Sequence, residues 1–209
     1  MSHDDFSFEP VRGLPERLPE GEVILWQGSP SSWHLACEAL SLRWIAGYFA
    51  VLVVWRVGVS STEVPVSEAL GHSVPLIVIG ALVCLLLYGL ATIQARSAVY
   101  TLTNKRVAMR IGASLTMTLN LPYTQIGNAE LAQRPDGSGS IAFELIGDTR
   151  FSYLLCWPHV RPWHIARTQP ALRCIPDAAA VARIFAEAAD ARVSEPRVER
   201  QIPNALAAE

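Results

Sequence analysis

The longest apolar run in the chain covers residues 74–93 and contains no charged side chain. At 1.5 Å per helical residue, such a run matches the ~30 Å hydrocarbon core of a bilayer. A buried helix of a soluble protein is the alternative, but such helices average ~11–12 residues and usually keep a polar face. We therefore predict a transmembrane helix over residues 74–93.

A second apolar segment precedes this run, and Arg56 is the only charged residue between positions 44 and 59. Extended back to residue 40, the segment is long enough to cross a bilayer, with Arg43 and Arg56 reaching opposite interfaces. We predict a first span at about residues 40–59. A re-entrant or interfacial helix is the alternative interpretation.

The connector between the two predicted spans, residues 60–73, contains Glu63 and Glu68 but no Lys or Arg. Basic residues lie instead beyond the far ends of the spans. The positive-inside rule therefore places the connector outside and both chain termini in the cytoplasm. The membrane part is predicted to be a two-helix transmembrane hairpin.

Beyond residue 97 the pattern changes from a helical period to alternation, and turn residues separate the alternating segments. Such segments are typical of antiparallel strands. The predicted strands cover residues 98–103, 106–111, 115–121, 126–132, 140–146 and 150–156, with a seventh extended piece within 164–174.

An amphipathic helix is predicted after these strands, with Asp177 as its cap. Its apolar face contains Val181, Ile184, Phe185 and Ala188, at the spacing of one helix face. Six or seven strands followed by one helix is the order of elements in a pleckstrin-homology-like domain. The predicted fold is therefore membrane α+β: a transmembrane hairpin plus an antiparallel β-barrel closed by a C-terminal amphipathic helix.

These patterns divide the chain into four parts. Residues 1–19 form a cytoplasmic tail without periodicity, and residues 194–209 form a second such tail, so both are predicted to be disordered. Residues 20–96 hold an extended lead-in and the hairpin, whose first helix is expected to be capped by Ser31 or Ser32. Residues 97–193 hold the pleckstrin-homology-like domain. The polar, acidic N-terminus predicts no cleavable signal peptide.

Charge is distributed unevenly along the chain. The formal net charge is −2, so the chain as a whole has no nucleic-acid signature. Between residues 94 and 175, however, nine Lys or Arg stand against four Asp or Glu. This excess indicates either attraction to anionic lipids or solvated strand faces. For the first interpretation we expect Lys105, Arg106 and Arg110 to face lipid.

Residues that could support catalysis or bind a cofactor are not arranged in a recognisable motif. The four cysteines form no C-x-x-C pair, and neither a Gly-rich phosphate loop nor a nucleophile-base order is present. No histidine lies within a predicted span. His34, near the first span, is either a pigment ligand or a plain interfacial residue. We expect no metal, no cofactor and no enzymatic activity.

Two sets of residues are candidates for contacts with partner proteins. The segment WPHVRPW, residues 157–163, combines Trp, Arg and Pro, residue types of rigid loops and interface hot spots. The alternative is that both Trp cover the barrel core. The second set consists of small residues in the spans, which let helices approach closely. The candidate partner-binding residues are Trp157, His159, Arg161 and Trp163, and the candidate helix-packing residues are Gly47, Gly80 and Gly89.

Five residue strings together resemble the PuhB family, the photosynthetic-complex assembly proteins of purple phototrophic bacteria. They lie in this order within residues 13–190: GLPERLPEGE (13–22), YTLTNKRV (100–107), MTLNLPY (117–123), WPHVRPW (157–163) and LRCIPDAAAVA (172–182). The string YTLTNKRV is also similar to that of bacterial pleckstrin-homology membrane proteins in general.

The resemblance implies a non-catalytic assembly factor for the reaction centre and the core light-harvesting antenna. It implies a multi-pass protein of the bacterial inner, intracytoplasmic photosynthetic membrane, which forms a homodimer and binds reaction-centre and core antenna subunits. It provides no catalytic residues. Two alternatives remain open: a general membrane-anchored module that binds membrane lipids, and a carrier that delivers bacteriochlorophyll.

Overall fold

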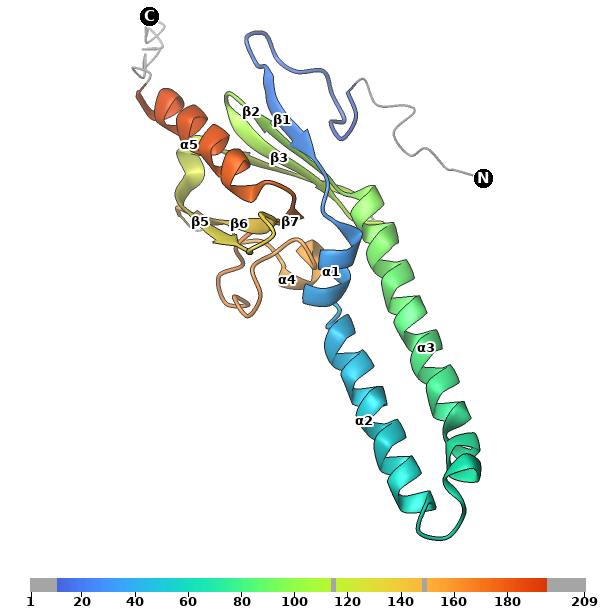
Figure 1. Cartoon of the computed structure of the whole chain (residues 1–209). Helices are drawn as coiled ribbons and strands as arrows, with labels where there is room; N and C mark the ends of the chain where they lie inside the picture. The colour runs from blue at the N-terminus through green and yellow to red at the C-terminus, as the bar shows by residue number, and fades with distance from the viewer. Residues whose placement is uncertain (1–10, 114–115, 148–149, 195–209) are drawn as a thin grey trace, which may run out of the picture.

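Two long helices extend from one end of a β domain in the computed structural model, which describes residues 11–113, 116–147 and 150–194 (Figure 1). Helix α2 (Leu42–Ser60) and helix α3 (Val66–Ser97) run antiparallel and pack against each other. They have 19 and 32 residues and are long and apolar enough to cross a membrane. Most of their apolar side chains are exposed, which is unusual for core helices of a soluble protein.

The first helical segment is broken, whereas a continuous helix was predicted. Helix α1 (Ser32–Glu38) is separate from α2, and Ser41 between them adopts a left-handed conformation with φ 55° and ψ 32°. Ser31 occupies the N-cap position of α1, as predicted, but its side chain makes no capping hydrogen bond. Its hydroxyl lies 3.0 Å from Nδ1 of His34 instead.

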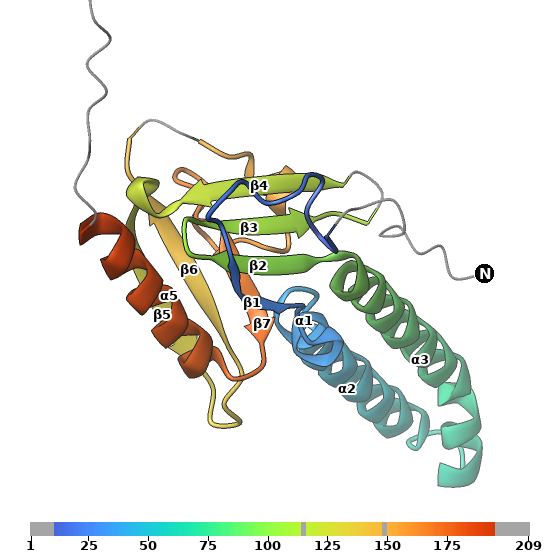
Figure 2. The same ribbon diagram turned by 90° about the horizontal axis from the view of Figure 1, so that it is seen from above.

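The β domain consists of two separate antiparallel sheets (Figure 2). The first sheet has the order β1 (Ile24–Gly28), β2 (Val99–Thr103), β3 (Arg106–Ile111), β4 (Met117–Pro122). A short 3₁₀ turn, η1 (Tyr123–Gln125), leads to the second sheet, with the order β5 (Ile126–Gln133), β6 (Gly139–Leu145), β7 (Ala171–Ile175). In the first sheet Val99 faces Arg110 and Tyr100 faces Met109.

The predicted closed barrel is wrong, because no strand pairing joins the two sheets in the described part of the chain. Residues 150–156, predicted as the sixth strand, instead contain the short helix α4 (Tyr153–Cys156). Their apolar side chains do not alternate: Tyr153 packs against the core, while Leu154 and its neighbour Leu155 are both exposed. The extended piece predicted within 164–174 is reduced to β7.

Strand β1 belongs to the β domain although it precedes the long helices. It pairs with β2, with Gln27 opposite Thr101 and Gly28 opposite Tyr100. Helices α1, α2 and α3 are therefore inserted between two neighbouring strands of one sheet. The β domain is therefore built from residues that precede the hairpin in the sequence and residues that follow it.

The main core lies between the two sheets and helix α5 (Ala178–Ser194). Val181 and Phe185 of α5 are buried there, as predicted, and the Phe185 ring lies 5.1 Å from the Phe143 ring and 5.4 Å from that of Tyr123. Figure 2 shows α5 beside β5 and β6. This helix thus covers the sheets rather than closing a barrel.

The predicted disorder of the N-terminal tail does not hold for its described part. Leu14 is buried, and Gly13 has a φ of +80° and lies directly against Val99. A Cβ atom at Gly13 would come within 2.5 Å of the Val99 side chain, so this position requires glycine. The expectations for residues 1–10 and 195–209 fall outside the described residues.

Candidate functional site

Helix α1 connects the hairpin to the β domain and packs on both. Its Leu35 is fully buried against Ala95 of α3 and Cys174 of β7, and Ala36 is fully buried against Ala91. The backbone N–H of Ser31 donates a 2.8 Å hydrogen bond to the carbonyl oxygen of Cys174. The start of the hairpin is therefore attached to the second sheet by both apolar packing and a backbone hydrogen bond.

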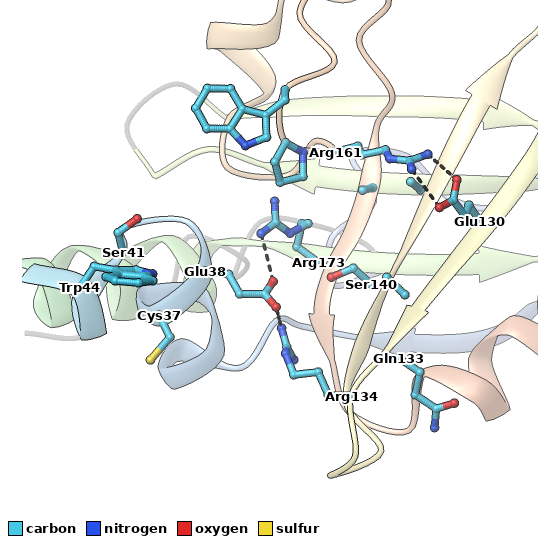
Figure 3. Close-up of a pocket in the computed structure, with 15 residues that line it drawn as sticks. Cys37, Glu38, Ser41, Trp44, Glu130, Gln133, Arg134, Ser140, Arg161 and Arg173 are labelled. Carbon is cyan, nitrogen blue, oxygen red and sulfur yellow. Dashed lines mark hydrogen bonds and ion pairs between the residues drawn. The ribbon is translucent and has the colours of Figure 1, made fainter.

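Glu38, the last residue of α1, forms the polar centre of this junction (Figure 3). Its carboxylate accepts a 3.1 Å hydrogen bond from Nη2 of Arg173 and is ion-paired with Arg134. It also accepts from Sγ of Cys174 at 3.3 Å. Burial alone would raise the pKa of Glu38. The hydrogen bonds from Arg134 and Cys174 and the charges of the two arginines outweigh burial, so that its pKa lies below the ordinary value and the carboxylate is charged.

Cys174 is not an activated thiol. Burial, reinforced by the charge of Glu38, raises the pKa of Cys174 to about 11. Because the thiolate is the nucleophilic form, this protonated thiol has little reactivity. Among the described residues, no group of three or more His, Cys, Asp or Glu side chains could hold a metal ion.

The segment 157–163 is fastened to the β domain by His159. This side chain is 1% exposed, and its Nδ1 lies 2.6 Å from the Tyr100 hydroxyl. Burial and the charge of Arg173 lower the pKa of His159 to about 3, so the ring is neutral. The Tyr100 hydroxyl accepts from the Arg173 backbone N–H at 3.3 Å, which leaves its own proton to donate to His159. Arg173 also donates to the Val160 carbonyl oxygen at 2.9 Å.

A pocket of about 530 Å³ lies between the α1–α2 corner and the second sheet. Ser41 and Trp44 line it from the corner, and Arg161 and Trp163 line it from the 157–163 segment. Arg161 is ion-paired with Glu130 of β5 across the pocket wall, with Nη2 2.8 Å from Oε1 (Figure 3). Arg134 and Arg173 share Glu38, and Arg161 pairs with Glu130, so the pocket is polar and contains three arginines against two glutamates.

His34 has both ring nitrogens engaged. Nδ1 lies 3.0 Å from the Ser31 hydroxyl oxygen, and Nε2 lies 2.9 Å from Oδ2 of Asp136. A pigment ligand needs a nitrogen lone pair that is free to bind the metal. In this arrangement His34 offers none without breaking one of these contacts.

The predicted partner-binding residues fall into two groups. His159 is buried and Arg161 is held by Glu130, so neither is presented to a partner in this conformation. Trp157 is 37% exposed and Trp163 is 89% exposed. The alternative in which both Trp cover the core therefore does not hold for Trp163.

Sequence reasoning missed three further exposed apolar residues near these Trp: Leu154, Leu155 and Ile165. The available signal was two adjacent leucines, which cannot both face a core from one strand. Interpreting residues 150–156 as a strand concealed that signal.

Residues 41–189 match the family profile described as a bacterial PH domain. The chain belongs to the bacterial PH domain family. It is also 46% identical, over 200 residues, to an uncharacterized 23.7 kDa protein in the puhA 5′ region of Rhodobacter capsulatus. That alignment covers 95% of this chain and 94% of the relative. A pleckstrin-homology-domain protein from Shewanella loihica, 13% identical, aligns with a TM-score of 0.30 over 44% of this chain and 71% of its own.

The basic residues expected to face lipid are not gathered near the long helices of this bacterial PH domain protein. The register of β2 and β3 places Arg106 at the end of the sheet remote from α3, beside Lys105. Lys105 donates to the Glu20 carbonyl oxygen and Arg106 is ion-paired with Glu22. Arg110 lies opposite Val99, near α3, but is only 8% exposed. This placement argues against a shared lipid-facing role, because Lys105 and Arg106 lie at the end of the first sheet that is remote from the hairpin.

The three candidate glycines of the hairpin differ in their surroundings. A Cβ atom at Gly80 would come within 2.9 Å of the Phe49 ring, so Gly80 lets α3 approach α2. A Cβ atom at Gly47 or Gly89 would meet nothing within 4 Å. These two positions lie on open faces of the hairpin, where a further helix could pack.

Proposed function

We propose that this bacterial PH domain protein is a non-catalytic assembly factor for the photosynthetic reaction centre and its core light-harvesting antenna. The observation that carries the proposal is the 46% identity, across 95% of the chain, to a protein of the puhA 5′ region. The five strings that resemble PuhB-family assembly proteins support the same role. In this proposal α2 and α3 cross the inner membrane, both termini are cytoplasmic, and the protein acts as a homodimer.

The geometry supports binding of partner subunits better than catalysis. The two long helices expose apolar faces along their length, and Gly47 and Gly89 leave open space on those faces. Close approach of a neighbouring helix at such small residues favours association through van der Waals packing. We propose that nascent transmembrane subunits pack there while the attached β domain remains on the cytoplasmic side.

Two other functions make different demands on the structure. A bacteriochlorophyll carrier would need a ligand, and the candidate His34 already uses both ring nitrogens. A general lipid-binding module would need no photosynthetic partner. We favour the assembly role over both because of the relative in the puhA 5′ region.

The test is affinity isolation of the tagged chain from mild-detergent membranes of phototrophically grown cells. Mass spectrometry would identify the protein partners, and an absorption spectrum of the same eluate would measure pigment. We expect reaction-centre or core antenna polypeptides without stoichiometric pigment. Recovery of lipids alone would favour the lipid-binding module, and stoichiometric pigment that is lost in His34→Ala would favour the carrier.

A further inference from the structure

The segment from α4 through the following loop carries an unusual amount of exposed apolar surface. Leu154 is 84% exposed, Leu155 64%, Trp163 89% and Ile165 67%. In the β domain of a soluble protein, large apolar side chains gathered in this way usually mark a site of contact with another molecule. Within the described residues, nothing in the chain covers these side chains.

This segment lies on the side of the β domain from which the long helices extend. Figure 1 shows α4 and the loop after it next to α1 and level with the start of α2. Trp163 lines the same pocket as Trp44, which is in the first turn of α2 and is 83% exposed. The exposed tip of the loop therefore lies at the depth at which the first candidate membrane span begins.

The position of the segment is fixed by its own contacts. His159 is hydrogen-bonded to Tyr100, and the Val160 carbonyl oxygen accepts from Arg173. Arg161 is ion-paired with Glu130. The middle of the loop is thus attached to both sheets, while the apolar side chains before and after it point away from the domain. Since α1 attaches the same domain to the hairpin, these side chains are held at one depth relative to α2.

Exposed basic residues flank these apolar side chains along the chain. Arg150 and Arg167 are both exposed and line one small pocket together with Glu144, and Arg43 is exposed beside Trp44. Trp at the boundary, aliphatic side chains beyond it and cations at the headgroup level are the residue types of a membrane-interface segment. The arrangement of charge and apolar surface matches an anionic bilayer surface.

We infer that residues 153–165 form a membrane-interface segment, with Leu154, Leu155 and Trp163 inserted at the boundary between headgroups and acyl chains. Arg43, Arg150 and Arg167 contact the phosphates of anionic phospholipids. In this arrangement the β domain contacts the membrane surface directly through residues 153–165. This inference depends on the membrane location of α2 and α3 in the proposed function, and it assigns Trp163 to lipid where the sequence suggested a protein partner.

The test is photo-crosslinking of the full-length chain in native membranes. Leu154 or Trp163 is replaced by p-benzoylphenylalanine, and the chain is irradiated before solubilisation and then purified. Val23 serves as the matched control, because it is also an exposed apolar residue, at 54%, but lies next to Asn104 at the remote end of the first sheet. Leu85 of α3, 67% exposed, is the positive control inside a span.

We expect the probes at Leu154, Trp163 and Leu85 to give chains heavier by one phospholipid molecule, and the probe at Val23 to give none. Protein adducts without lipid adducts at Leu154 and Trp163 would overturn the inference in favour of a protein-docking surface. Lipid adducts at Leu85 alone would overturn it while leaving the membrane anchor intact. An equal lipid yield at Val23 would also overturn it, and loss of the Leu85 adduct would remove the anchor and the inference together.

Discussion

Glu38 ion-pairs with Arg173 of β7 and with Arg134, which directly follows β5. Arg173 is only 5% exposed, so removing the charge of Glu38 leaves a buried cation without its carboxylate. We predict that Glu38→Gln lowers the free energy of unfolding by about 1–3 kcal/mol, less than the ~3–5 kcal/mol of a fully buried pair, because the Glu38 side chain is 36% exposed. Thermal unfolding in detergent would measure the loss.

Glu130→Gln is the matched control for this variant. Glu130 also pairs with an arginine at the pocket, but both partners are substantially exposed. An exposed pair of this kind contributes ~0–1 kcal/mol. Equal losses in the two variants would mean that Glu38 is no more important than a surface carboxylate.

His159 makes stability depend on pH in a defined direction. Its pKa in the folded chain is about 3, whereas the unfolded chain takes up the proton near 6.5. The contribution of His159 is therefore complete above pH 6.5 and is lost as the pH falls below that value. Between pH 7.5 and 5 we predict a loss of about 2 kcal/mol in the free energy of unfolding. Melting temperatures measured across this range would detect it.

Replacement of the histidine should remove this dependence. His159→Gln is expected to give a shallower fall in melting temperature between pH 7.5 and 5. His164→Gln, in the same loop but at the surface, is expected to keep the slope of the unmodified chain. Glu38 does not interfere, because its lowered pKa places its own loss of stabilisation below the ordinary glutamate value. A slope unchanged in His159→Gln would contradict the assignment.

At the level of elements, helices α2 and α3 contain one tight glycine position, Gly80, and four open ones, of which Gly47 and Gly89 are candidate packing sites. Gly80→Leu is predicted to overpack the contact with Phe49, to destabilise the chain by about 1–3 kcal/mol and to lower its abundance. Gly47→Leu and Gly89→Leu should leave the chain abundant, since nothing lies within 4 Å of an added Cβ. If partner helices pack at these open positions, the same two variants will lower the yield of reaction-centre and core antenna complexes.

Immunoblots of the chain and absorption spectra of the membranes would separate these effects. A stable Gly80→Leu variant would show that the two helices do not depend on close approach at this point. Normal pigment-protein yield in both Gly47→Leu and Gly89→Leu would remove these faces as the partner site.

Elements with a regular period could be predicted from sequence, and the irregular ones could not. The apolar runs predicted both long helices, and alternation predicted β2 to β6 within a few residues. The helix break at Ser41 was missed, because a left-handed serine carries no local signal. The α4 segment was missed because apolar residues of a four-residue helix can imitate a strand.

The junction could not be predicted, because it depends on contacts between distant parts of the chain. Glu38 and Arg173 are separated by 135 positions, and Tyr100 and His159 by 59. The packing of α1 between α3 and β7 brings Glu38 to Arg173. The Tyr100–His159 contact forms within the β domain, where the segment after α4 packs on β2. The sequence singled out residues 157–163 as a candidate partner-binding segment, but it did not show that Pro158, His159 and Val160 are buried while Trp163 is exposed.

For the whole molecule, the proposed crossing of the membrane by α2 and α3 predicts that the connector and the β domain lie on opposite sides. The connector at residues 61–65 lies at the far end of the helices from the β domain (Figure 1). We predict that an impermeant maleimide labels Thr62→Cys in intact cells and labels Asp190→Cys, on α5, only after lysis. The unmodified chain controls for its four native cysteines. Labelling of both variants in intact cells would contradict cytoplasmic termini.

The insertion of the hairpin between β1 and β2 has a consequence for the order in which the protein matures. Strand β1 leaves the ribosome about 70 residues before its neighbour, which at ~5–20 residues per second is several seconds of synthesis. During that interval the strand has no ladder to join, and both helices must be placed before β2 can reach it. If α2 and α3 enter the membrane as proposed, the first sheet is completed only after both helices have been synthesised, and until then β1 remains an unpaired strand of the kind that quality-control proteases recognise.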